Sequence, residues 1–331
     1  MTALVDVEIA GELIDGRAIA RALKDEVVRE VKEVGERGIS CGLAVVMVGE
    51  AYSQGAYERR LRRLASEFDV PYRLHALPEE CSQVELVELV GKLNDDESVS
   101  GTLILRPLPA HIDEPTVFEA LSVLKDVEAV HPENAGLLAL GDPRYIPSTA
   151  ASTFHILDTW LRAQGHDLEQ FYRQSTVVIV GRSANVGRPA ASLAYARQAV
   201  VVSVDEWASR LGRLPEFTAQ ADVLVVAAGV PGLIGAEHLK DGAIVLDVGI
   251  NALQDSGTGN VFMVGDVDTA SARTVARAVT PVPGGIGPVT DVWLLRNTVA
   301  AAHNITAAAT EQRRAALETV NDTEASSHER R

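Results

Sequence analysis

The chain contains little cysteine: among its 331 residues only Cys41 and Cys81 occur. Two unpatterned cysteines are too few for a disulfide framework or a zinc site, so we expect reduced thiols and no bound metal. The sequence also lacks an apolar run of the roughly 18 residues that a membrane span requires, and its first ten residues carry acids where a signal peptide carries lysine or arginine. These absences predict a cytoplasmic protein with no membrane partner.

Basic residues are scarce relative to acidic ones. The 30 lysines and arginines face 46 aspartates and glutamates, which gives a formal net charge of −16. A field of this sign repels nucleic acid, although it permits an anionic ligand in a locally positive cleft. We therefore expect a small-molecule substrate and no nucleic-acid partner. With 47% hydrophobic residues the chain can bury two moderate cores, so two domains are expected.

Residues 176–187, TVVIVGRSANVG, are the most informative stretch of the chain. Apolar β-formers lead into a glycine turn, and a second glycine opens an expected helix, which is how a chain cradles a dinucleotide pyrophosphate. A glycine turn can also serve packing alone. Strand-like segments at 200–204, 222–229 and 242–249 follow at intervals that leave room for helices, and this alternation favours a Rossmann-type parallel sheet.

The first half of the chain has a βαβ organisation of its own. Its apolar spacing predicts strands at 43–49 and 101–109, with helices at 16–38, 56–68 and 83–96; further helices are expected at 149–165 and 291–320. The predicted domains are a first α/β lobe over 1–148, completed by a C-terminal helix over 289–320, and a dinucleotide-binding lobe over 149–288. Residues 321–331 are expected to form a polar flexible tail.

Four motifs stand out as a set: VVIVGRSANVGRP (177–189), AIVLDVGIN (243–251), VGDVD (264–268) and TPVPGGIGPVTDVWLLRNT (280–298). Together they resemble the methylenetetrahydrofolate dehydrogenase/cyclohydrolase family of the FolD type, and the likeness covers nearly the whole chain. The resemblance implies an α/β fold of two lobes, the second a Rossmann-type doubly wound parallel sheet, with an active-site cleft between them. It also implies a tetrahydrofolate substrate on the first lobe and a homodimer formed through the cofactor domain.

The segment PVPGGIGP (281–288) combines three prolines with three glycines. This composition gives a stiff loop in which several positions can adopt positive φ, as close approach to a ligand requires. We expect Pro283, Gly284 and Gly285 to contact the folate. A rigid hinge between domains is the alternative interpretation.

The chain departs from the family pattern on the basic helix. Family members with both activities carry a tyrosine followed four residues later by a lysine that is implicated in hydrolysis of the methenyl intermediate. Tyr57 matches the tyrosine, but Leu61 occupies the lysine position, and leucine cannot move a proton. The neighbouring Arg60 and Arg62 stay protonated and are poor substitutes. Leu105 likewise replaces a family glutamine that belongs beside the lysine, so both polar groups are lost together.

Other positions keep part of the expected folate site. Tyr57 is available to stack on a pterin ring, although it can equally be a core aromatic. Glu128 stands where the family has aspartate, so a carboxylate for the donor edge of the pterin is retained, and Ala129 replaces a glycine. Lys125 and Asp126 match the motif, but a surface ion pair is an alternative for them. The segment 146–152, IPSTAAS, departs from the family pattern.

The resemblance assigns the dinucleotide to the glycine turn, with Gly181, Arg182, Ser183 and Gly187 at the pyrophosphate and ribose. Ile250 is expected near the nicotinamide. Asp205 follows the next strand, where an acid binds ribose hydroxyls and repels a 2′-phosphate, so NAD is favoured over NADP. Against this, Arg182 can pair with a phosphate, and Asp205 can simply cap a helix.

The resulting hypothesis is a 5,10-methylenetetrahydrofolate dehydrogenase that transfers hydride to NAD(P)⁺ and has weak or no cyclohydrolase activity. Tyr57, Leu61 and Glu128 are its candidate catalytic positions, and Leu105 is a further substrate position. Hydride transfer requires alignment and charge stabilisation but no obligatory protein base, so it can survive the two leucines. Three alternatives stay open: a bifunctional enzyme, a non-catalytic paralogue, and a dehydrogenase acting on another substrate.

Overall fold

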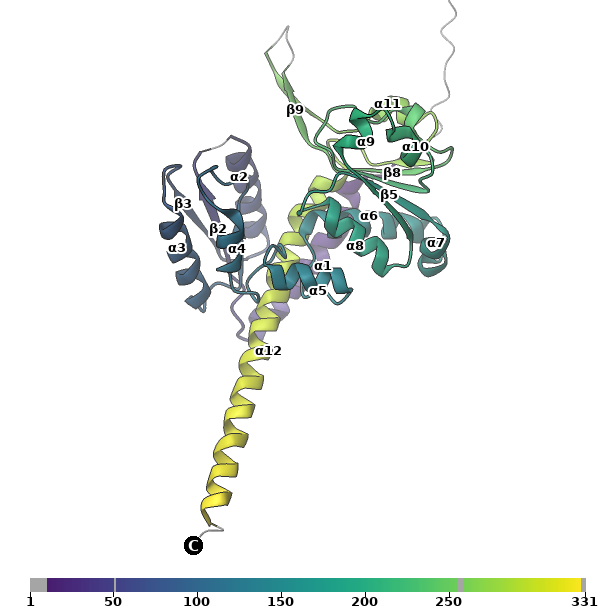
Figure 1. The fold of residues 1–331 in the computed structure, drawn as a ribbon. Helices are drawn as coiled ribbons and strands as arrows, with labels where there is room; N and C mark the ends of the chain where they lie inside the picture. The colour runs from purple at the N-terminus through teal and green to yellow at the C-terminus, as the bar shows by residue number, and fades with distance from the viewer. Residues whose placement is uncertain (1–10, 51, 255–258, 329–331) are drawn as a thin grey trace, which may run out of the picture. The chain divides into compact units, whose positions relative to one another are not determined.

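The computed structural model describes residues 11–50, 52–254 and 259–328 (Figure 1). The chain packs as two compact units. The six-stranded unit comprises the described residues through Glu26 together with Glu128–Leu294, and the three-stranded unit comprises Val27–Val127 with the chain from Leu295 onward. These units are groups of residues that pack together and do not define domain borders along the chain. The domain borders expected at 148/149 and 288/289 therefore stay a prediction.

A parallel sheet forms the centre of the six-stranded unit. Its strand order is β1-β11-β8-β7-β5-β6, and every pairing in it is parallel. This sheet confirms the expected Rossmann-like strands and adds two short ones that the sequence did not indicate, β1 and β11. The bounds are β1 Glu12–Leu13, β5 Thr176–Val180, β6 Val200–Val204, β7 Val223–Val226, β8 Ile244–Asp247 and β11 Ala278–Val279.

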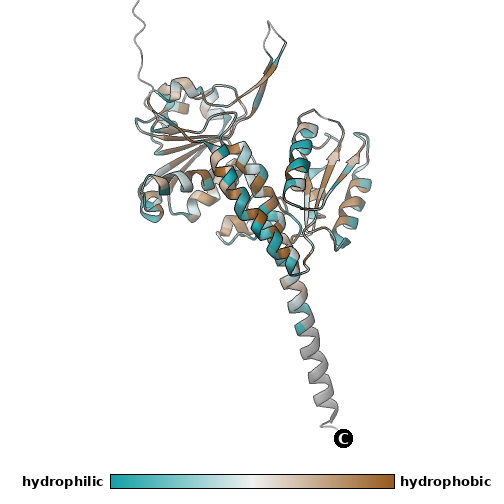
Figure 2. Ribbon diagram, turned by 180° about the vertical axis from the view of Figure 1, so that it is seen from behind, coloured by the Kyte–Doolittle hydropathy of each residue, from teal (hydrophilic) through white to brown (hydrophobic). Residues whose placement is uncertain are grey.

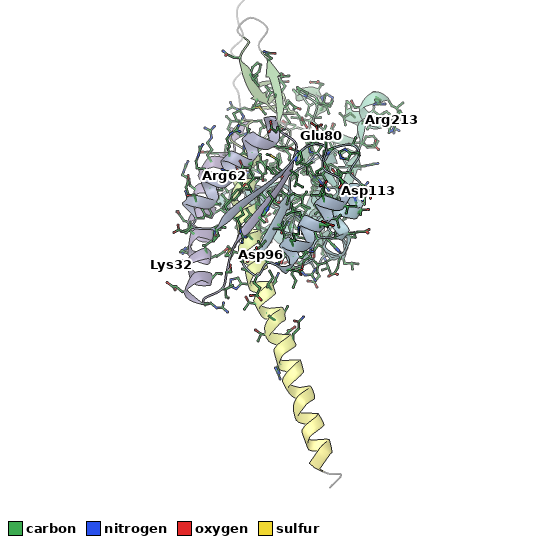
Figure 3. All side chains as sticks on the ribbon, turned by 90° about the vertical axis from the view of Figure 1, so that its left-hand side faces the viewer. Lys32, Arg62, Glu80, Asp96, Asp113 and Arg213 are labelled. Atoms are coloured by element: carbon green, nitrogen blue, oxygen red, sulfur yellow. The ribbon has the colours of Figure 1, made fainter. Side chains whose placement is uncertain are left out.

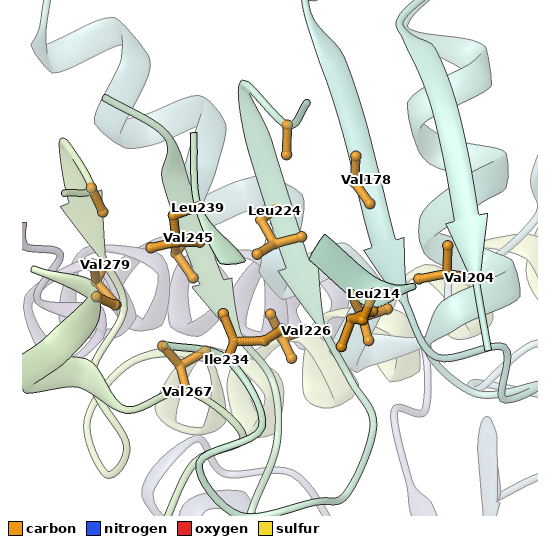
Figure 4. Packing of buried hydrophobic residues seen from close by; sticks show 14 residues of the cluster. Val178, Val204, Leu214, Leu224, Val226, Ile234, Leu239, Val245, Val267 and Val279 are labelled. Carbon is orange, nitrogen blue, oxygen red and sulfur yellow. The ribbon is translucent and has the colours of Figure 1, made fainter. Parts of the chain in front are cut away.

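The inner strands β5, β7 and β8 of this sheet are almost completely buried. Val178 on β5, Leu224 and Val226 on β7 and Val245 on β8 belong to one buried cluster (Figure 4). The surrounding elements are α5 Pro132–Leu140, α6 Ser148–Ala163, α7 Leu168–Gln174, α8 Gly187–Ala196, α9 Glu206–Arg210, α10 Leu214–Thr218, the 3₁₀ turn Ala236–His238, the antiparallel hairpin β9 Asn251–Gln254 and β10 Val261–Val264, and α11 Thr269–Ala272.

A smaller parallel sheet of order β3-β2-β4 forms the three-stranded unit. Its elements are β2 Leu43–Val48, α2 Tyr52–Glu67, β3 Tyr72–Leu77, α3 Gln83–Asp95, β4 Gly101–Ile104 and α4 Glu114–Glu119. Two long helices, α1 Gly16–Glu36 and α12 Ile286–His328, contribute residues to both units. Because α12 continues to His328, its helical backbone covers most of the expected tail at 321–331.

Hydrophobic residues concentrate on the strands of both sheets (Figure 2). In the part of the chain that the structure describes, no helix combines the length and the apolar character needed to cross a membrane. Cys41 and Cys81 are both free thiols and both buried. Burial raises the pKa of Cys41 to about 12, which keeps this thiol protonated and unreactive.

Candidate active site

The turn after β5 requires glycine at two positions. Gly181 has φ +110°, and a Cβ on it would lie 2.1 Å from the carbonyl oxygen of Ala227. A Cβ on Gly187, the first residue of α8, would lie 2.0 Å from the carbonyl oxygen of Gly181. Both clashes are with main-chain atoms, which cannot move aside as a flexible side chain can. The backbone therefore folds tightly over the start of α8, as a phosphate-binding turn does.

Ser183 orders the rest of this turn. Its hydroxyl accepts a hydrogen bond from the N–H of Val186 at 3.2 Å, and its carbonyl oxygen accepts one from the N–H of Arg188 at 3.0 Å. Helix α8 begins here with no side-chain cap on Val186. The positive end of the helix dipole thus points into the turn, where it favours an anion.

Arg182 and Asp205 form an ion pair, although the sequence analysis took Asp205 as a sign of NAD and Arg182 as a residue able to pair with a phosphate. Arg182 Nη1 lies 2.9 Å from Asp205 Oδ2, and Arg182 Nη2 donates to the carbonyl oxygen of Ser203 at 2.6 Å. The other carboxylate oxygen of Asp205 accepts a hydrogen bond from the N–H of Trp207 at 3.1 Å and so caps α9. The helix-capping interpretation of Asp205 is confirmed, and the same carboxylate also holds the guanidinium.

Two buried aspartates join the loops at the carboxyl ends of β7 and β8. Asp247 accepts hydrogen bonds from the N–H groups of Gly249, Asp266 and Val267, each at 3.0 Å. Asp266 accepts hydrogen bonds from the N–H groups of Ala228 at 2.6 Å and Gly229 at 2.8 Å. Both side chains are fully buried. These carboxylates replace the hydrogen bonds that the loop backbone would otherwise make with water.

The loop after β8 and the loop after β10 approach so closely that each needs a glycine. A Cβ on Gly249 would lie 2.1 Å from the carboxyl carbon of Asp266, and a Cβ on Gly265 would lie 1.8 Å from Asp247 Oδ2. Burial raises the pKa of Asp247 to about 7, and the charge of Asp266 acts in the same direction. Ile250, the expected nicotinamide neighbour, lies in the tethered loop and is 58% exposed. Its side chain is therefore accessible to a ligand.

The segment 280–285 packs against the first turn of α1. Thr280 Oγ1 accepts a hydrogen bond from the N–H of Asp247 at 2.7 Å, which links this segment to β8. Gly284 has φ +116°, and a Cβ on Gly16 would lie 1.8 Å from the carbonyl oxygen of Gly285. The expected ligand loop thus has its backbone fixed at both ends, and Pro283 follows a cis peptide bond within it.

Tyr57 and Leu61 lie on one face of α2, since they are four residues apart. Tyr57 is half-buried, and the guanidinium carbon of Arg60 lies 5.1 Å from the centre of its ring. Leu61 is fully buried, at 0% exposure. Arg62, labelled in Figure 3, also lies on α2. It is held by Glu58 at 2.6 Å, and the hydroxyl of Tyr72 also donates to Glu58. Arg62 is therefore committed to an ion pair.

Gln54 is a residue of this face that the sequence analysis missed. It lies one turn before Tyr57, is 4% exposed, and its Nε2 donates to the carbonyl oxygen of Pro107 at 2.8 Å. Its Oε1 is buried, and no atom of the described residues donates a hydrogen bond to it. Leu105, two residues before Pro107, is also buried. The spacing of Gln54 and Tyr57 on a helix is the signal that would have identified it.

The KDVE motif (125–128) has structural roles that its sequence did not indicate. Lys125 is 6% exposed, and its Nζ donates to the carbonyl oxygens of Leu93, Asn94 and Asp96 at 2.7–2.9 Å. The surface ion pair considered for Lys125 and Asp126 is wrong, since both are buried. Glu128 Oε2 accepts a hydrogen bond from the N–H of Ser148 at 3.3 Å, at the start of α6. Ala129 has φ +51°, a conformation that favours glycine.

Two domain families match most of the chain. Residues 14–128 match the tetrahydrofolate dehydrogenase/cyclohydrolase catalytic domain, and residues 147–306 match the NAD(P)-binding domain of the same name. The chain is 54% identical over 298 residues to bifunctional protein FolD 3 of Rubrobacter xylanophilus, covering 90% of this chain and 94% of the relative. It is 39% identical to bifunctional protein FolD of Acetivibrio thermocellus, covering 88% and 96% of the two chains.

Solved structures agree with these sequence relatives. The bifunctional enzyme FolD, methylenetetrahydrofolate dehydrogenase/cyclohydrolase, from Campylobacter jejuni superposes with a TM-score of 0.80 at 35% identity, covering 89% of this chain and 99% of the other. The Trypanosoma brucei enzyme, complexed with NADP and an inhibitor, gives a TM-score of 0.81 at 32% identity, covering 89% and 98%. The expected α/β fold with a Rossmann-like NAD(P)-binding part is confirmed.

Proposed function

We propose that this chain, which belongs to the tetrahydrofolate dehydrogenase/cyclohydrolase family, oxidises 5,10-methylenetetrahydrofolate with NAD(P)⁺. The observation that carries the proposal is the glycine turn 181–187, whose two glycines let the backbone fold tightly at the uncapped start of α8, as a pyrophosphate-binding turn does. A bound NAD(P)⁺ would supply a hydride acceptor for the methylene carbon, and the product would be 5,10-methenyltetrahydrofolate. Tyr57, Glu128 and Pro283–Gly285 are the residues we assign to the folate.

The residues present fit a dinucleotide. Gly181 and Gly187 allow the close main-chain packing of the turn, and Ser183 holds that turn in shape. Arg182 supplies a cation beside it. Asp247 and Asp266 fix the loops that we assign to the nicotinamide end, so that Ile250 is presented on a rigid backbone.

NAD is the cofactor we propose in preference to NADP. Asp205 already neutralises Arg182, so a 2′-phosphate would have to displace this carboxylate to gain the guanidinium. Asp205→Asn keeps a helix-capping side chain but removes the charge. We expect this variant to lower the KM for NADP about tenfold relative to NAD. Glu206→Gln is the matched control, since Glu206 pairs with Arg210 instead. An unchanged ratio of the two KM values would contradict the role given to Asp205.

We propose weak or absent cyclohydrolase activity on the basis of the side chains on α2. Water addition to the methenyl carbon requires a group that moves a proton. Leu61 cannot do so, and Arg62 is bound to Glu58. We expect the chain to oxidise the methylene substrate while hydrolysing the methenyl product no faster than buffer does.

A paired assay tests both halves of the proposal. NADH or NADPH production from 5,10-methylenetetrahydrofolate is measured beside the loss of 5,10-methenyltetrahydrofolate, in the unmodified chain, in Leu61→Lys and in the control Leu61→Met. Reduction without hydrolysis supports the proposal, and hydrolysis gained only by the lysine variant strengthens it. Efficient hydrolysis by the unmodified chain identifies a bifunctional enzyme instead. Dinucleotide binding with no folate-dependent reduction identifies a non-catalytic protein or one with another substrate.

We further propose that the chain forms a homodimer through the β9–β10 hairpin. This hairpin exposes Leu253, Val261, Phe262 and Met263 at 37–62% each, and exposed apolar residues grouped in this way are typical of interfaces. Sedimentation of a Val261→Ser, Phe262→Ser variant should show monomers where the unmodified chain shows dimers. Leu140→Ser, which removes an apolar side chain that is 84% exposed elsewhere, is the control.

A further inference from the structure

Trp207 is an exposed tryptophan beside the residue that we assign to the cofactor ribose. The chain has three tryptophans; Trp160 is 5% exposed, Trp293 is half-buried, and Trp207 is 56% exposed. An indole of this size is normally covered, because it contributes a large apolar area. Its exposure therefore indicates that a ligand covers the indole ring.

The position of Trp207 is fixed by its neighbours. Asp205 binds the N–H of Trp207, so the start of the tryptophan side chain is tied to the carboxylate. The guanidinium carbon of Arg210 lies 5.1 Å from the centre of the indole ring, and Arg210 is itself paired with Glu206 at 2.7 Å. The ring is thus supported by a cation that is anchored in turn.

The strand order places this tryptophan at the adenosine end of the expected cofactor. β6 lies at the edge of the six-stranded sheet, beside β5, and α9 follows it directly. Arg182 connects the glycine turn after β5 to Asp205 after β6. In a dinucleotide the base is attached to the ribose, so a ribose held at Asp205 brings the adenine within reach of the next side chains along the chain.

We infer that Trp207 stacks on the adenine base of the bound dinucleotide and is a binding residue for its adenosine half. This inference rests on the proposed function, because it presupposes an NAD(P) site at the glycine turn. Stacking suits the residue, since an indole offers a flat apolar face and a purine offers another. It requires no hydrogen bond to the base, and it therefore acts on NAD and NADP alike, in contrast to Asp205.

Binding of nucleotide fragments tests the inference. Dissociation constants for NAD, AMP and nicotinamide mononucleotide are measured by calorimetry for the unmodified chain, Trp207→Ala, Trp207→Phe and the control Leu211→Ala. Leu211 is 65% exposed at the end of α9. We expect Trp207→Ala to weaken NAD and AMP about tenfold, the effect of about one lost base stack. Trp207→Phe should stay within about threefold, and nicotinamide mononucleotide should be unaffected.

Tryptophan fluorescence gives a second readout that does not depend on activity. AMP should quench emission in the unmodified chain and not in Trp207→Phe, because the other two tryptophans are more buried. Unchanged NAD and AMP affinity in Trp207→Ala would overturn the inference alone. Equal weakening of AMP and nicotinamide mononucleotide would also overturn it, since a disturbed turn rather than a lost stack explains that pattern. No dinucleotide binding by the unmodified chain would overturn the proposed function as well.

Discussion

The amino group of Lys125 lies 2.9 Å from the carbonyl oxygen of Leu93, and the same group reaches the carbonyl oxygens of Asn94 and Asp96. The last carbonyls of a helix have no partner within the helix, and they form its negative end. A buried ammonium with three such acceptors satisfies its own donors and the end of α3 together. Lys125 therefore stabilises the three-stranded unit.

Replacement of Lys125 by methionine should lower the free energy of unfolding by about 3 kcal/mol, because three carbonyl groups at the end of α3 lose a charged donor. Urea denaturation measures the change. Lys92→Met is the control: Lys92 lies on the same helix, is exposed, and its replacement should change stability by no more than about 0.5 kcal/mol. Equal effects of the two variants would show that the buried ammonium adds nothing.

Replacement of glycine by alanine should lower the stability of the chain at Gly187 and raise it at Gly91. A Cβ on Gly187 meets the backbone of Gly181, so Gly187→Ala should destabilise the chain by about 2 kcal/mol or more and abolish dinucleotide binding. Gly91 lies inside α3, and apart from its two chain neighbours and the surrounding backbone of its own helix no atom of the described residues lies within 4 Å of its added Cβ. Gly91→Ala should therefore stabilise the chain by up to about 1 kcal/mol. Thermal and urea unfolding, with calorimetry of NAD binding, compare the two; a stabilising Gly187→Ala would contradict the close approach.

Asp247 should make stability depend on pH near neutrality. Its pKa is raised from 3.8 to about 7 by burial, so the protonated form favours the folded state. This contribution is complete below about pH 4 and is lost as the pH rises through about 7. The stability advantage of the unmodified chain over Asp247→Asn should shrink by roughly 2 kcal/mol between pH 5 and pH 8. Urea denaturation of both proteins at pH 5 and pH 8 measures this difference in the free energy of unfolding. A difference that grows with pH would contradict the prediction.

Ala129→Gly should stabilise the chain slightly. Alanine at φ +51° costs about 1–2 kcal/mol, whereas glycine adopts this region freely. Glycine also gives the unfolded chain more freedom, which costs about 0.4–1 kcal/mol. The first effect exceeds the second, so we expect a net gain of about 0.5 kcal/mol. The melting temperature of this variant is compared with that of Ala135→Gly, inside α5, which should fall.

Strands β7 and β8 could be predicted from the sequence, whereas the edge strand β3 could not. β7 is apolar at every position and β8 at every position before Asp247, and both are fully buried, so a continuous apolar run identifies them. β3 lies at the edge of its sheet, is only partly buried, and contains Arg73 and His75. The β9–β10 hairpin was missed although turn residues separate its strands, and residues 255–258 between them lie outside the described part of the chain.

The candidate site likewise contains features that could be predicted from the sequence and features that could not. Gly181 and Gly187 could be predicted because a glycine turn is a local property of the chain. The pairing of Arg182 with Asp205 could not, since it depends on the register that sets Val180 beside Val204 in neighbouring strands. The complete burial of Leu61 could not be predicted either, because four arginines surround it on α2.

Each of the two loops that contain Gly249 and Gly265 carries an aspartate that occupies the place of the other loop's missing methyl group. A change in one loop therefore demands a matching change in its counterpart. During divergence the segments 247–251 and 264–268 have to vary as a pair, and a chimera that exchanges only one of them with a distant relative should fail to assemble this end of the sheet.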